Sequence, residues 1–159
     1  MKRAIATLTI SSLVLISGTA TRAQEGPPEY GMPISAQQAS AVAAAAVETM
    51  AENGWRMAVS VVDPAGHLVH FEKVDGTQNA SIEISMRKAQ AAAGFRRPTR
   101  VFAQGIANNP ALATLPGVVG SPGGVPIVVD GRVIGAAGCS GGTGDQDEIA
   151  CEAGAAAAQ

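Results

Sequence analysis

The chain has 159 residues, enough for one domain, and 47% of them are hydrophobic while only 3% are aromatic. Its formal net charge at pH 7 is −2. Binding to nucleic acid needs basic patches, and single strands also need aromatic side chains for stacking. The composition excludes nucleic acid as a partner.

The first 23 residues have the pattern of a secretory signal peptide. Lys2 and Arg3 precede an apolar stretch, Ile5–Ile16, that is shorter than a membrane-spanning helix requires. Small residues then flank a cleavage position after Ala23. We expect an exported protein, periplasmic or extracellular, with no membrane span in the mature chain. Removing residues 1–23 leaves 8 basic and 13 acidic residues, which strengthens the argument against nucleic acid.

A helix is predicted to follow a flexible leader over residues 24–33, which are rich in proline and glycine. Ser35 and Gln38 form a capping-box pattern, and Gly54 is a typical helix stop. Both faces between these positions carry small residues. This pattern suits a helix packed on two sides in a homo-oligomer, but the high helix propensity of alanine also explains it.

Residues 55–62 and 67–74 are predicted to form a hairpin around a type I turn at residues 63–66. His67 and His70 are three apart on the second predicted strand, so their side chains should point to opposite faces and cannot share one ion. Either could be an axial haem ligand or an ordinary polar residue.

A second helix is predicted over Thr77–Phe95, with Ile82, Met86, Ala89 and Ala93 on one face and a Glu83–Arg87 ion pair on another. Arg87 and Lys88 either meet an anionic ligand or are solvated surface charges. Arg96 and Arg97 are further cations available to such a ligand.

Pro98 breaks this helix, and Thr99 is a candidate N-cap for a short third helix. The long loop Asn109–Gly124 is typical of a binding loop or an interface element.

A second hairpin pairs Val125–Val129 with Val133–Cys139 through Asp130-Gly131, a strong type I′ turn signal. The glycine-rich loop Gly141–Gly144 follows, and then a helix whose first turn is acidic. Because these acids would repel an anion, we expect the glycine loop to bound a pocket by shape, with Asn109–Gly124 as its other wall. Cys139 and Cys151 either form a disulfide or remain as two buried thiols.

These elements predict an α+β layered domain over residues 34–159, with an antiparallel sheet of two hairpins and flanking helices. The stretches VVDPAGHLVHFEKVDG, SIEISMRKAQAAAGF and GGVPIVVDGRVIGAAGCSGGTGDQDEIACEAG resemble the GlcG/HbpS family of haem-binding or haem-degrading domains, related to the C-terminal domain of PduO-type proteins. The resemblance covers about Ile34 to Ala158. Lys73-Val74-Asp75-Gly76 and the two cysteines depart from the family's usual residues.

The resemblance implies a profilin-like fold, higher oligomers and, in some members, haem binding. We therefore expect an exported protein that binds haem or a related small cofactor. The alternative is an enzyme that acts on a small organic acid in the glycine-lined pocket. The candidate ligand-binding residues are His67, His70, Arg87, Lys88, Gly124, Ser140 and Gly141, with His70 as the candidate iron ligand.

Overall fold

The computed structural model describes residues 26–158, so the predicted signal peptide lies outside the described residues. The order of elements is β1 (Glu29–Tyr30), α1 (Ala36–Glu52), β2 (Ala58–Val62), β3 (Leu68–Lys73), α2 (Ala80–Phe95), α3 (Arg100–Asn108), the 3-10 helix η1 (Pro110–Thr114), β4 (Gly124–Val129), β5 (Arg132–Ser140) and α4 (Gly144–Ala156). The α+β prediction is confirmed. No helix among these is long and apolar enough to cross a membrane.

The two predicted hairpins form one sheet. β2 pairs antiparallel with both β3 and β5, and β4 pairs antiparallel with β5. The β4–β5 turn has the predicted geometry, with positive φ at both Asp130 and Gly131. β1 adds a short parallel pairing to Arg132 and Val133 of β5. Two residues of the predicted leader, Glu29 and Tyr30, therefore belong to the sheet.

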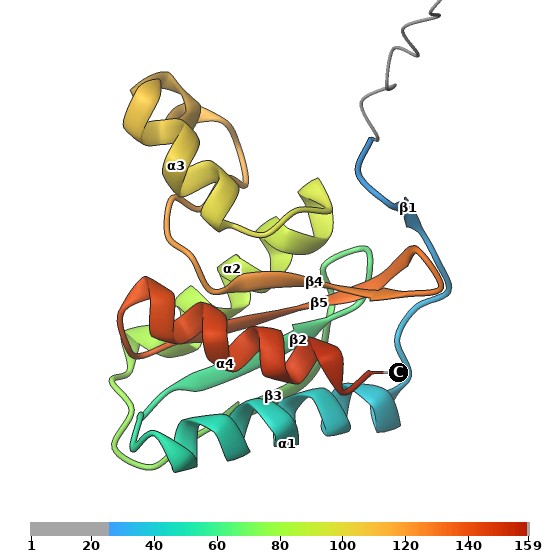
Figure 1. The fold of residues 1–159 in the computed structure, drawn as a ribbon, viewed down its shortest axis with the longest axis vertical. Helices are drawn as coiled ribbons and strands as arrows, with labels where there is room; N and C mark the ends of the chain where they lie inside the picture. The colour runs from blue at the N-terminus through green and yellow to red at the C-terminus, as the bar shows by residue number, and fades with distance from the viewer. Residues whose placement is uncertain (1–25, 159) are drawn as a thin grey trace, which may run out of the picture.

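Helices cover both faces of the sheet, with α1 and α4 on one face and α2 on the other, while α3 and η1 project from the body (Figure 1). The larger core cluster lies between the sheet and the α1–α4 pair, and a smaller one lies under α2. β2 is buried along its whole length because it has a strand on each edge and helices on each face.

Helix α1 forms as predicted. The Ser35 hydroxyl accepts from the Gln38 amide at 3.2 Å, and the Ser35 amide donates to the Gln38 side chain at 3.2 Å. The helix ends before Gly54, whose φ is +68°. Its buried face carries Ala39, Val42, Ala43, Ala46 and Met50.

Helix α2 buries only part of the predicted face. Ala89 and Ala93 are buried and Met86 packs against their core cluster, whereas Ile82 is 43% exposed. Ser81, Ser85 and Lys88 are buried as well. Small residues are selected there because the helix lies directly on β5: a methyl group at Gly138 would collide with the Ser85 carbonyl oxygen. The helix therefore packs on the sheet mainly through small residues and not through a stripe of large apolar side chains.

Thr99 starts α3 but does not cap it with its side chain. Its hydroxyl instead accepts a hydrogen bond from the Gly124 amide at 2.9 Å, which ties α3 to the start of β4. None of the residues of α3 is buried.

Candidate functional site

The surface has a first hollow of about 370 Å³ between α2 and the loop after η1, which we call the apolar hollow. Its walls are Arg87, Gln90, Ala91, Gly94, Phe95, Pro116, Gly117, Val118 and Val119. The predicted Glu83–Arg87 pair is present at 2.6 Å, and the Arg87 side chain is 67% exposed. Arg87 is the only charged residue of this lining.

The last turns of α2 leave room for this hollow because Ala91 and Gly94 carry little or no side chain. Phe95 is fixed at its end by Phe102 of α3, with ring centroids 4.7 Å apart. The predicted binding loop supplies the opposite wall through residues 116–119. The long loop therefore lines a hollow on α2 and not the glycine-lined pocket for which it was predicted.

A second hollow of about 400 Å³, which we call the glycine hollow, is lined by Gly54, Trp55, Arg56, Gly76, Gln78, Gly141, Gly142 and Gln146. The glycine loop thus bounds a pocket, as predicted, and Gly141 lies in it. The expected second wall is wrong, because Asn109–Gly124 contributes no residue to this hollow. The segments after α1 and before α2 form that wall instead.

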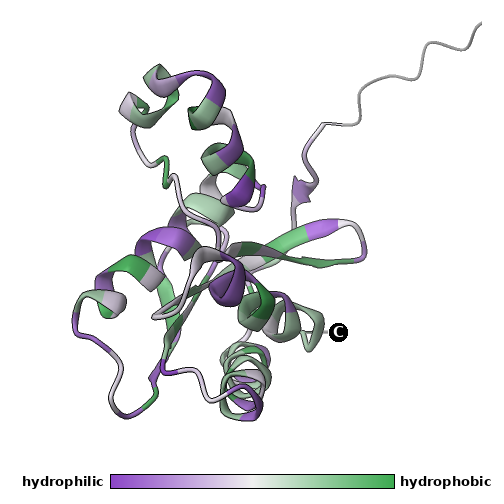
Figure 2. Ribbon diagram, turned by 60° about the vertical axis from the view of Figure 1, so that its left-hand side comes forward, coloured by the Kyte–Doolittle hydropathy of each residue, from purple (hydrophilic) through white to green (hydrophobic). Residues whose placement is uncertain are grey.

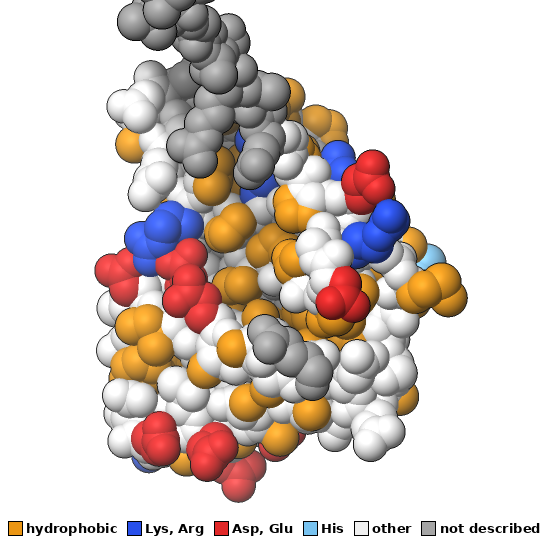
Figure 3. All heavy atoms as spheres, turned by 45° about the vertical axis from the view of Figure 1, so that its right-hand side comes forward, with side chains coloured by type: hydrophobic (Ala, Val, Ile, Leu, Met, Phe, Trp, Pro, Cys, Tyr) orange, Lys and Arg blue, Asp and Glu red, His pale blue; other side chains and the backbone are white. Residues whose placement is uncertain are grey.

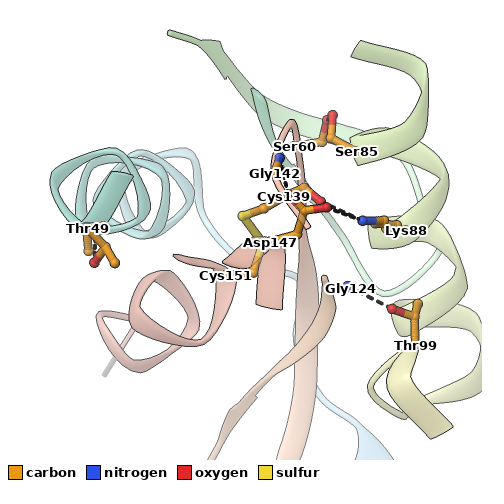
Figure 4. Close-up of a disulfide and its surroundings, with 11 residues drawn as sticks. Thr49, Ser60, Ser85, Lys88, Thr99, Gly124, Cys139, Gly142, Asp147 and Cys151 are labelled. Atoms are coloured by element: carbon orange, nitrogen blue, oxygen red, sulfur yellow. Dashed lines mark hydrogen bonds and ion pairs between the residues drawn. A yellow bond between two sulfur atoms is a disulfide. The ribbon is translucent and has the colours of Figure 1, made fainter. Parts of the chain in front are cut away.

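Lys88 does not lie in either hollow. Its ammonium donates to the Cys139 carbonyl at 3.1 Å and to the Asp147 carboxylate at 2.7 Å, and its side chain is 1% exposed (Figure 4). Asp147 also accepts from the Gly142 amide at 2.9 Å. The expectation that Lys88 is a surface cation is therefore wrong. The Lys88 ammonium is buried and does not reach a ligand at the surface.

Gly123 covers this ion pair. A Cβ atom there would lie 2.6 Å from the Asp147 Cβ and 3.0 Å from the Lys88 Nζ, and its φ is +114°. Glycine is required at this position by both the close approach and the backbone conformation.

Gly124 and Ser140 are also interior residues. The Gly124 amide is bonded to Thr99, and the Ser140 hydroxyl lies 3.4 Å from that of Ser81. Neither residue lines the apolar hollow or the glycine hollow.

Cys139 and Cys151 form a disulfide between β5 and α4, with Cα atoms 5.7 Å apart, which settles the choice between a bridge and two thiols (Figure 4). Both cysteines are fully buried.

The histidines are not two residues of one strand. His67 precedes β3 in the turn, is 80% exposed, and its Nδ1 lies 3.1 Å from Asp63. Burial raises the pKa of the Asp63 carboxyl, but hydrogen bonds from His67 and Ala65 outweigh it and leave that pKa below its usual value.

His70 lies within β3 opposite Val61, with its Nε2 4.0 Å from Glu72. Neither His67 nor His70 lines the apolar hollow or the glycine hollow. Within residues 26–158, no group of three or more histidine, cysteine, aspartate or glutamate side chains is placed to hold a metal ion.

The acidic start of α4 is neutralised internally. Arg100 contacts both Asp145, at 2.6 Å, and Glu148, and these hydrogen bonds raise the pKa of the Arg100 guanidinium. Thr143 and Gln146 form a capping box there. The backbone amides of Thr143 and Gln146 at the start of α4 are thus bonded by side chains at that same helix end.

The family model described as "Haem degrading protein HbpS-like" matches residues 34–156, nearly all of the described chain. The chain belongs to the HbpS-like family. Protein GlcG of Escherichia coli strain K12 is 40% identical over 108 residues, which cover 67% of this chain and 81% of GlcG.

Solved structures share this fold. A double mutant of HbpS from Streptomyces reticuli is 29% identical, covers 96% of this chain and 97% of its own, and has a TM-score of 0.74. The complex of PduOC with haem is 24% identical over 79% of this chain and 95% of its own, with a TM-score of 0.71. At that identity the likeness to PduOC shows a shared fold.

Of the residues that the sequence predicts as ligand-binding, Arg87 and Gly141 line a hollow, whereas Arg56 and Gln78 of the glycine hollow were not among the predicted residues. Three separate segments meet at the glycine hollow, and no spacing along the chain signals that meeting.

Proposed function

We propose that this chain binds haem, with one edge of the porphyrin in the apolar hollow. The observation that carries the proposal is an apolar depression of about 370 Å³ with a single cation, Arg87, in its lining. An apolar wall suits the macrocycle, and a guanidinium suits a propionate. The description of the family as haem degrading supports this ligand class.

The residues of the hollow fit the porphyrin rather than its iron. Phe95, Val118 and Val119 are apolar wall residues, and the lining contains no imidazole, thiolate, thioether or phenol. His70, the expected iron ligand, lies on β3 outside the hollow. Haem supplies redox chemistry at its iron when bound; the residues of this chain bind the porphyrin edge and shield it from water.

Gly94 allows a direct test by haemin titration followed through the Soret band. A Cβ at this position meets nothing within 4 Å, so the backbone accepts a side chain here, and Gly94→Trp adds an indole to the lining of the hollow. We expect saturable binding by the wild type, at least about tenfold weaker binding by Gly94→Trp and little change in the matched control Gly94→Ala. Equal haemin affinity in Gly94→Trp would refute this site.

Arg87 provides an independent test. Arg87→Gln should weaken haemin binding by about tenfold, the usual scale for one hydrogen bond to a charged group. Glu83→Gln removes the partner of Arg87 and keeps the cation, so it should not weaken binding. Loss of affinity in Glu83→Gln alone would show that the cation is not the determinant.

We also propose export. The disulfide supports it, because structural disulfides persist in oxidising compartments. Mass spectrometry of periplasmic or culture fractions should find a mature chain that begins at Gln24. A full-length chain confined to the cytoplasm would overturn this proposal.

A homo-oligomer is the proposed assembly. Apolar side chains extend across the face in Figure 3 between small groups of charges, and Figure 2 shows hydrophobic residues along the projecting α3. Val101 of α3 is 43% exposed, and Leu115, directly after η1, is 48% exposed. Apolar area of this kind is typical of an interface, and a monomeric mass by light scattering at micromolar concentration would contradict the assembly.

A further inference from the structure

We propose that the glycine hollow is a second ligand site, which binds a small carboxylate bearing a neighbouring hydroxyl or oxo group. The two hollows share no lining residue, so this site is separate from the proposed haem site. Its walls come from the segments after α1, before α2 and at the start of α4.

Arg56 gives the site its charge. It is the only charged residue of the lining. Arg87, Arg96, Arg100 and Arg132 each donate to a partner. Within residues 26–158, Arg56 and Arg97 make neither a hydrogen bond nor an ion pair, and of these two only Arg56 lines the hollow. The lining therefore contains one positive charge and no acidic residue.

The position of Arg56 is set by Gly76. A Cβ on Gly76 would lie 3.1 Å from both the Cδ and the Nη1 of Arg56, so the side chain packs over bare backbone at the rim of the hollow. Arg56 is an exposed residue, and a carboxylate matches the fork of a guanidinium with two parallel hydrogen bonds.

The other polar side chains of the lining are the carboxamides of Gln78 and Gln146. The Gln146 Oε1 accepts from the Thr143 amide at 2.9 Å, which leaves its NH₂ group as a donor. Gln78 lines the same hollow with an exposed side chain. Such groups suit a hydroxyl or oxo oxygen next to the carboxylate.

The lining also limits the ligand's size and polarity. Four of the eight lining residues are glycines, so the ligand would contact backbone, and Trp55 is the one large flat side chain. A porphyrin needs an apolar wall, which this lining does not offer. A small hydroxy or oxo acid matches one cation, two amides and one indole.

The test uses the only tryptophan of the chain, Trp55, as a reporter inside the site. Lactate titrated into the full mature protein should change its fluorescence saturably in the millimolar range, and the neutral isostere lactamide should not. Arg56→Gln should weaken lactate binding by about tenfold to a hundredfold. Arg97→Gln is the matched control, because it removes an exposed arginine that lines neither hollow.

Three results would overturn the proposal: no saturable change with lactate or pyruvate, equal binding by Arg56→Gln, or tighter Arg56-dependent binding of inorganic phosphate than of lactate. The outcome is independent of the proposed haem site. Arg56→Gln should keep its haemin affinity, and Gly94→Trp should keep its lactate affinity.

Discussion

Lys88 of α2 and Asp147 of α4 form an ion pair inside the molecule, with Nζ and Oδ2 2.7 Å apart and side chains only 1% and 4% exposed. The same ammonium reaches the Cys139 carbonyl, and the same carboxylate holds the Gly142 amide. One charge pair thus joins the two helical layers through the end of β5, beside the glycine loop.

Removing one member of this pair should be costly. Lys88→Met leaves the Asp147 carboxylate buried without its counter-charge, and we expect a loss of about 3–5 kcal/mol in the free energy of unfolding, measured in urea. Arg87→Gln, one residue earlier on the exposed face, should cost less than about 0.5 kcal/mol.

The double variant separates the pair from simple packing. Lys88→Met combined with Asp147→Asn leaves no unpaired charge, so it should recover at least about 1 kcal/mol relative to Lys88→Met. A Lys88→Met protein as stable as the wild type would show that the pair is not formed.

The Cys139–Cys151 bridge should contribute to stability through the short loop that it closes. The sequence separation is 12, for which the loop-entropy model gives about 3 kcal/mol. Replacing both cysteines with alanine should lower the free energy of unfolding by that order, and reductant should then have no further effect. The denatured, unreduced wild type should contain no titratable thiol; two thiols per chain would contradict the bridge.

The contribution of the β2–β3 turn to stability should depend on pH because of Asp63. Its carboxylate accepts from the amides of Ala65 and His67 at 2.8 and 2.9 Å, and its pKa is lowered from the usual 3.8. As the pH falls, Asp63 is therefore protonated in the unfolded chain before it is protonated in the folded protein. The stability that the ionised Asp63 carboxylate adds to the folded protein is complete above pH 3.8, and it is lost as the pH falls through the lower pKa of the folded state.

Asp63→Asn is the corresponding variant. It should be less stable than the wild type by up to about 1 kcal/mol near neutral pH, and the difference should disappear in acid. Unfolding in urea from pH 6 down to about pH 2 checks this; a difference that stays constant over that range would show that the ionised carboxylate is not involved.

Local signals in the sequence predicted much of the fold. Ser35 and Gln38 cap α1, and Asp130-Gly131 turns the second hairpin, because each motif acts within four residues. Lys88 was misplaced because its partner, Asp147, is 59 residues away, and because α2 packs on β5 through small residues rather than through Ile82. The candidate site was predicted in part for the same reason: Arg87 and the glycine loop were visible locally, whereas the meeting of Arg56 with Gly76 and Gly141 depends on tertiary packing.

The location of bound haem tests the central proposal most directly. A crystal of the full mature protein grown with haemin, measured at the iron absorption edge, gives the iron position from anomalous scattering. We predict an iron peak beside the apolar hollow, with porphyrin density against Phe95 and Val118 and a propionate at Arg87. An iron peak bound at His70, with no porphyrin density in the apolar hollow, would contradict the account.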